Sequence, residues 1–185
     1  PDDRKKRYIN EYNLSNYDAS VLTSDKSVSD FFDNVIKVDS SLKKSSKIVV
    51  NWITSELFSL LNENDLEINN SPITPENLGK LVKLIMDEVI SGKIAKDVLL
   101  EMFSTKKDPD KIIEDKGLKQ VTDTSLIETI VDDVIDENQK MVEQYLSGKD
   151  KLLGFFVGQA MKKSKGKANP KILNEILKEK LSKKN

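Results

Sequence analysis

The sequence contains no cysteine and no histidine, and these two absences restrict the chemistry that the chain can support. They remove thiol nucleophiles, imidazole bases and the usual ligands of structural zinc. A catalytic site would have to use carboxylates, lysine, serine, threonine or tyrosine. The lack of cysteine also fits a reducing compartment, so we expect a cytoplasmic protein.

Long apolar runs are missing as well. No stretch approaches the 18 or more apolar residues that span a bilayer, and no secretory signal peptide is recognisable. We therefore expect no membrane partner. The chain begins at Pro1 rather than at methionine, which we interpret as the start of a piece excised from a longer protein.

What is present is a helical pattern along almost the whole chain. Apolar residues recur three and four positions apart, as on the buried face of an amphipathic helix. Only residues 118–122 have extended character, and this stretch is too short to build a sheet. The predicted fold class is therefore all-α, with helices at residues 4–12, 15–22, 28–38, 41–62, 75–92, 94–104, 109–117, 125–135, 141–146, 151–163 and 170–181.

The same pattern predicts two domains. Gly117 can end one helix, and Ser125 with Glu128 has the spacing of a capping box that opens the next. We place a helical domain at residues 1–117, which is a common domain size, and a smaller tail domain at residues 118–185. The tail is near the size at which a helical core is only marginally stable. The expected core residues are Trp52, Ile53, Leu57, Leu81 and Ile85 in the first domain and Ile130, Val134, Phe156, Ile172 and Ile176 in the second.

The net charge of −1 conceals a strong separation of charge along the chain. Residues 144–185 include eleven lysines and three acidic residues, which is a net charge of +8. The region before them is acidic, with Asp132, Asp133, Asp136 and Glu137 close together. A basic C-terminal region of this kind indicates a polyanion as the partner.

Two glycines, Gly154 and Gly158, stand inside the helix predicted at residues 151–163. A glycine in a helix interior costs about 1 kcal/mol relative to alanine. Residues four apart share one face of a helix, so the two glycines leave a strip of bare backbone. Such a strip serves either close packing of another helix, which is the commoner use, or the close approach of a phosphate–sugar chain. The spacing alone leaves both uses open.

Four segments of the chain have a distinctive sequence: YDASVLTSDK (17–26), ISGKIAKDVLLEMF (90–103), DPDKIIEDKGLKQVTD (108–123) and GKDKLLGFFVGQAMKKSKGKANP (148–170). They resemble the GatB/YqeY family, the C-terminal part of the B subunit of bacterial glutamyl/aspartyl-tRNA amidotransferases. In the last segment Phe156 and Ala160 stand where the family usually has leucine and valine. Both exchanges keep the position apolar. Together the four segments extend the resemblance over nearly the whole chain.

The resemblance implies an all-α domain followed by a small tail that contacts tRNA at its outer elbow. It implies a heterotrimeric enzyme that converts Glu-tRNA(Gln) or Asp-tRNA(Asn) to the amidated form, using ATP, magnesium and ammonia from glutamine. The family's kinase and metal sites lie in an N-terminal domain outside this sequence. We therefore expect no cofactor and no activity in this chain alone. The expected partners are tRNA(Gln) or tRNA(Asn) and the other amidotransferase subunits.

We expect the tRNA to bind the tail, through a site with no catalytic and no metal-binding residue. The residues of this expected site are Lys149, Lys151, Gly154, Gly158, Gln159, Lys162, Lys163, Lys165, Lys167 and Asn169. The alternative is a helical protein–protein scaffold, in which the glycines only pack and the acidic residues 132–137 dock a basic partner. An enzyme using Asp132 and Asp136 is disfavoured, because these acids lie on the polar face of an amphipathic helix.

Overall fold

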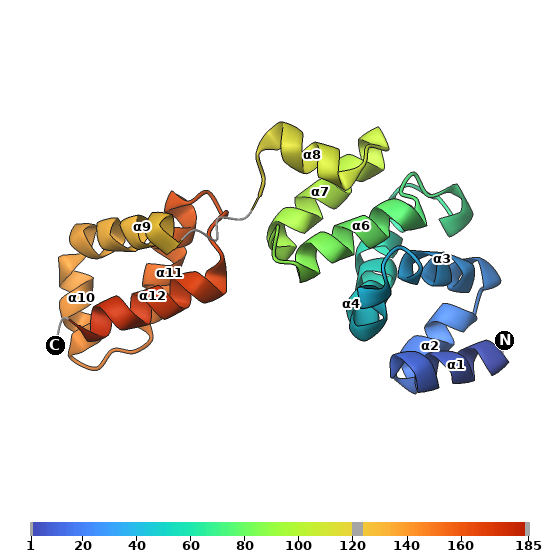
Figure 1. Cartoon of the computed structure of the whole chain (residues 1–185), viewed down its shortest axis with the longest axis horizontal. Helices are drawn as coiled ribbons and strands as arrows, with labels where there is room; N and C mark the ends of the chain where they lie inside the picture. The colour runs from blue at the N-terminus through green and yellow to red at the C-terminus, as the bar shows by residue number, and fades with distance from the viewer. Residues whose placement is uncertain (1, 120–123, 184–185) are drawn as a thin grey trace. The chain divides into compact units, whose positions relative to one another are not determined.

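The computed structural model describes residues 2–119 and 124–183. Most of these residues are helical and none lies in a strand, which confirms the predicted all-α fold (Figure 1). The segment at residues 118–122, predicted to be extended, falls largely outside the described residues.

The described residues group into two compact units. The first unit contains residues 2–87 and 92–117, and the second contains residues 88–91 together with those from Leu118 onward. Whether each unit folds as an independent domain, with the boundary that the sequence predicts, remains a prediction.

The first unit is a stack of short helices around α3 (Lys26–Ile36) and α6 (Pro75–Met86). Helix α3 packs on α2, α4 and α6, and α6 packs in turn on α7 and α8. Side chains of Thr74 and Asp108 accept hydrogen bonds from Asn77 N and Asp110 N, which caps α6 and α8 as their sequences predict. The helices are α1 (Asp2–Tyr12), α2 (Asn16–Thr23), α3 (Lys26–Ile36), η1 (Ser40–Ser45), α4 (Ser46–Asn51), η2 (Trp52–Leu57), α5 (Phe58–Glu63), η3 (Ile68–Asn70), α6 (Pro75–Met86), α7 (Gly92–Thr105) and α8 (Pro109–Lys116).

One long helix predicted at residues 41–62 is wrong in its detail. The stretch begins as the 3₁₀ segment η1 and continues as the α-helix α4. It then widens to the π-helix η2 and ends as the α-helix α5. Buried Ile53, Leu57 and Leu61 are four residues apart, which exceeds the 3.6 residues of an α-helical turn. The wider turn keeps these three side chains on one buried face.

Helix α6 is also shorter than predicted. It ends at Met86 rather than at Gly92, because Asp87 caps it and Glu88 adopts a left-handed conformation with φ of 59°. Ile90 is nevertheless buried, although it lies outside the helix. Of the expected core residues in this unit only Ile85 is half-buried, and the other four are buried.

The second unit is built on three helices that each pack against the other two: α9 (Thr124–Glu137), α11 (Leu152–Lys163) and α12 (Pro170–Ser182). The shorter α10 (Gln139–Leu146) packs on α9 and α11. Since α9 begins at Thr124, Ser125 lies inside the helix and not at its N-cap, so the capping box predicted there is wrong. The unit's core includes Val131, Val134, Phe156, Leu173 and Leu177, all completely buried.

The predicted core of the second unit is correct in its centre and less so at its edge. Val134, Phe156 and Ile176 are buried, whereas Ile130 and Ile172 are half-buried and pack against the core from outside. Leu126, which continues the apolar pattern of α9, is 56% exposed.

Phe156 gives a direct test of the independence of the two units. Phe156→Ala should remove about 3–5 kcal/mol from the second unit, because it replaces a fully buried ring by a cavity. Trp52 is the single tryptophan of the chain and lies in the first unit. Its fluorescence transition in urea should therefore keep its midpoint, while the circular dichroism transition acquires an earlier phase.

Leu126→Ala is the matched control, since it truncates an exposed apolar residue of the same unit and should leave both transitions in place. If Phe156→Ala shifts the Trp52 transition by the same amount as the circular dichroism transition, the chain unfolds as one cooperative body.

Candidate nucleic-acid interface

Helix α11 is positioned by the face that it buries. Phe156 and Ala160 are completely buried in the core of the second unit, where the Phe156 ring packs edge-on against Tyr145 at 6.1 Å between centroids. These two buried positions are four residues apart, so they lie on one side of the helix. The opposite side of α11 consequently faces away from the core.

Both predicted glycines lie on that outer side. Gly154 and Gly158 are exposed, and a methyl group placed on either Cα would meet no described atom within 4 Å beyond its chain neighbours and the adjacent backbone of α11 itself. Neither glycine is therefore needed for close packing within this unit. Of the two uses that the spacing leaves open, helix packing inside the unit is excluded, and the bare backbone faces open space.

Lysines stand at both ends of the bare strip. Lys151, Gly154, Gly158 and Lys162 follow one another at spacings of three and four residues, which places them along one exposed face. Lys165 follows in the turn after α11, with a left-handed φ of 57°. Within residues 2–119 and 124–183 no carboxylate lies within 4.0 Å of an ammonium group of these three lysines.

The remaining predicted basic residues are distributed around this face. Lys149 is exposed in the loop before α11, and Lys167 is half-buried in the loop after it. Lys163 lies one position round the helix and donates to Glu137 Oε1 of α9 at 2.8 Å. The hydrogen bond from Lys163 to Glu137 raises the pKa of the lysine, and the nearby Asp133 adds to this effect. Lys163 is thus held in an ion pair, unlike Lys162.

The two predicted amide residues have different environments. Gln159 is half-buried beside Gly158. Asn169 is only 2% exposed, and its Oδ1 accepts a hydrogen bond from Ile172 N at 3.1 Å, which caps α12. The structure therefore brings the glycines together with Lys151 and Lys162 on one face of α11, with Lys165 exposed in the turn that follows. Asn169 has a structural role instead.

The acidic side chains of α9 contribute partly to the fold of the same unit. Asp132 accepts from Lys180 of α12 at 2.7 Å, and Glu137 pairs with Lys163 as described. Sequence patterns gave no signal of these pairs, because each joins residues that are far apart in the chain. Asp133 and Asp136 remain exposed and form no ion pair among the residues that the structure describes.

The described residues include no group of three or more acidic side chains placed to hold a metal ion. They also include no helix that is both long enough and apolar enough to cross a membrane.

Comparison with known proteins agrees with the resemblance noted in the sequence. A family model described as the GatB domain matches residues 30–181. The chain belongs to the GatB domain family. Among its relatives is the B subunit of the aspartyl/glutamyl-tRNA(Asn/Gln) amidotransferase of Rickettsia rickettsii (strain Sheila Smith), which is 53% identical over 182 residues. The proteins of the same name from Alkalilimnicola ehrlichii and Pelagibacter ubique are 51% and 49% identical over 181 residues.

Each of these comparisons covers nearly all of this chain but a minor part of the relative. The match spans 98% of the chain and 37% of each GatB-family relative. The chain thus spans little more than a third of the length of the curated relatives it matches.

The open space beside the two glycines predicts that replacing either of them by alanine raises the stability of the second unit. Gly154→Ala and Gly158→Ala should each stabilise the second unit by about 1 kcal/mol, since alanine favours the helix and meets no neighbour. The midpoint of urea unfolding, followed by circular dichroism, measures this change. Gly166→Ala is the control and should destabilise, because Gly166 has a φ of 78° that alanine rarely adopts. A loss of stability in both helix variants would mean that the glycines are packing residues.

Proposed function

We propose that the chain is the tRNA-binding part of the B subunit of an amidotransferase, and that the outer face of α11 is its RNA contact. The observation that carries the proposal is the exposed glycine strip, whose flanking Lys151 and Lys162 form no ion pair within residues 2–119 and 124–183. Phosphate–sugar backbones require close approach and positive charge, and this face offers both. Membership of the GatB family supports a role in amidation of Glu-tRNA(Gln) or Asp-tRNA(Asn).

In this role the chain positions the substrate and carries out no chemistry. The sequence has no histidine and no cysteine, and no GxxxxGK[ST] phosphate loop is present. We propose that ATP and magnesium are used elsewhere in the complete enzyme, in the part of the B subunit that this chain does not cover. Contact at the outer elbow of the tRNA fits this division, because it leaves the aminoacylated end free to reach a distant catalytic site.

The recognition expected at this face is of shape and backbone. Folded RNA is bound largely through phosphates and ribose hydroxyls, and these groups need no pocket for a base. None of the aromatic side chains described in the second unit is classed as exposed. Single-stranded RNA, which stacks its bases on exposed aromatic rings, is therefore a poorer candidate than folded tRNA.

The glycine strip can be blocked without disturbing the core. Gly158→Leu adds a side chain to open space on the outer face of α11, and leucine favours a helix. We expect the helix to remain folded and the affinity for tRNA to fall about tenfold or more, because the RNA backbone is held away from the helix. Filter binding or fluorescence anisotropy with tRNA(Gln) and tRNA(Asn) measures the affinity.

Gly92→Leu is the matched control, since Gly92 also has open space around it but begins α7 in the first unit. It should bind tRNA like the parent. Equal affinities of parent and Gly158→Leu, with the helix intact, would place the RNA contact elsewhere and leave a protein-binding role for this face.

The salt dependence of binding separates the lysines at the strip from the paired lysine beside it. Lys162→Gln should weaken binding to different tRNAs by similar factors. It should also reduce the slope of log affinity against log salt by about 0.7–0.9, as expected for one lost phosphate contact. Lys163→Gln removes the same charge one residue away, but from an ion pair with Glu137.

We therefore expect a smaller change of slope for Lys163→Gln than for Lys162→Gln. A larger change for Lys163→Gln would show that the contact faces α9 rather than the glycine strip.

A further inference from the structure

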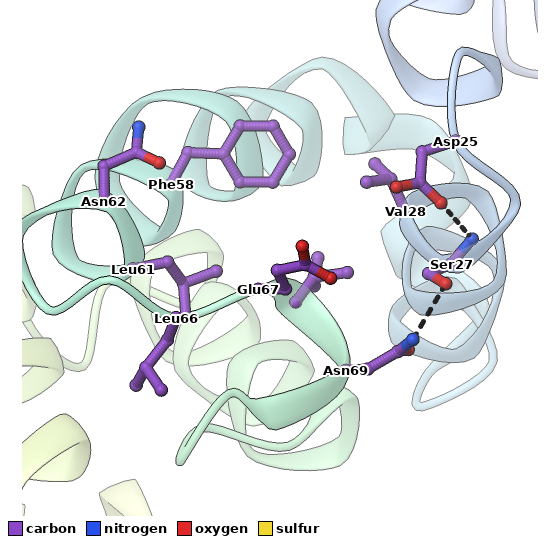
Figure 2. Close-up of a pocket in the computed structure, with 10 residues that line it drawn as sticks. Asp25, Ser27, Val28, Phe58, Leu61, Asn62, Leu66, Glu67 and Asn69 are labelled. Carbon is purple, nitrogen blue, oxygen red and sulfur yellow. Dashed lines mark hydrogen bonds between the residues drawn. The ribbon is translucent and has the colours of Figure 1, made fainter.

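A cavity of about 240 Å³ belongs to the first unit, whereas the surface that the proposed function uses belongs to the second. It is formed between the start of α3, the end of α5 and the segment that leads into η3. Its apolar floor includes the buried side chains of Val28, Leu61 and Ile68. Phe58, which directly follows the π-helical turn η2, contributes an aromatic ring to its wall (Figure 2).

The charged groups of this cavity are all of one sign. Asp25 and Glu67 are both among the ten lining residues, and none of the ten is basic. The Glu67 carboxylate has no hydrogen-bond or ion-pair partner in the part of the chain that the structure describes. Asp25 accepts from Ser27 N at 2.8 Å through one oxygen, which caps α3 and leaves the other oxygen available.

Figure 2 shows how these groups are arranged. The ring of Phe58 and the carboxylates of Asp25 and Glu67 surround the same space, with Ser27 beside Asp25. Ser27 is itself held by Asn69, whose Nδ2 donates to the Ser27 hydroxyl at 3.0 Å. Asp25 and Glu67 are both exposed, so the cavity opens to solvent on their side. It thus offers accessible carboxylate acceptors and a half-buried aromatic face above an apolar floor.

We propose that this cavity receives an arginine side chain presented by a partner protein. The guanidinium group can stack on the Phe58 ring and donate two hydrogen bonds to the Glu67 carboxylate. The aliphatic stem of the same side chain then covers Val28 and Leu61. Arginines inserted in this way into partly apolar pockets are among the strongest single contacts of protein interfaces.

The size and the charge of the cavity argue against other occupants. Sites for small molecules and cofactors usually measure about 300–1,000 Å³, so this cavity has the dimensions of a single side chain rather than of a cofactor. Two carboxylates without a compensating cation repel the phosphates of a nucleic acid. A metal ion would require more ligands than these two acids, and no group of three exists among the described residues.

The experiment uses the intact chain and two neutral-capped tripeptides, acetyl-Gly-Arg-Gly-amide and the same peptide with citrulline. Citrulline has the shape of arginine but no charge. In ¹H–¹⁵N spectra the arginine peptide should shift the amide signals of Ser27, Val28 and Ile68 in a saturable manner. The citrulline peptide should bind at least tenfold more weakly. Equal shifts with both peptides would overturn the proposal.

A pair of variants identifies the carboxylate involved. Glu67→Gln keeps the size of the side chain and should reduce the affinity for the arginine peptide about tenfold. Glu63→Gln is the matched control, because Glu63 is exposed at the end of α5 and does not line the cavity. Unchanged affinity in Glu67→Gln would overturn the proposal, as would tighter binding of acetyl-Gly-Lys-Gly-amide or of spermidine than of the arginine peptide. Binding of tRNA plays no part in these measurements, so their outcome is independent of the proposed function.

Discussion

The burial of one face of α11 between α9 and α12 is the interaction on which the second unit depends. Phe156 is its largest fully buried side chain, and in so small a unit one aromatic ring is a large share of the core. Because an α-helix turns once every 3.6 residues, burying Phe156 and Ala160 leaves Gly154 and Gly158 on the opposite side. The core thus decides which surface of α11 is offered to a partner.

The residues on the outer surface of α11 lower the stability of the helix. Its two glycines reduce helix propensity at positions where no neighbour requires their small size. Residues of this kind are expected where function needs close approach, because stability and activity then conflict. The charges show a similar division. Lys163 and Lys180 are held by acids of α9, whereas Lys151 and Lys162 at the strip pair with no carboxylate among the residues that the structure describes. The fold uses one set of lysines and leaves the other available to a polyanion.

Much of this architecture could be predicted because it depends on local interactions. The all-α class follows from the spacing of apolar residues, and the ends of several helices follow from individual side chains. Asp108 before Pro109, the left-handed Gly117 and Asn169 before Pro170 are examples. Each of these signals acts within about four residues, so it is visible without knowledge of the tertiary structure. The glycine strip and the basic region around it are visible for the same reason.

The remaining features were decided by tertiary packing, which joins residues that the sequence does not place together. The sequence by itself determined that Gly154 and Gly158 share a face, but only the packed unit shows that no other described helix comes within 4 Å of a Cβ placed on either glycine. The ion pair of Lys163 was likewise decided by tertiary packing, since its partner Glu137 lies 26 residues away in the chain. Tertiary packing also decided the π-helical turn η2 and the exposure of Leu126. An apolar pattern predicts which residues can be buried, and the neighbouring helices decide which of them are.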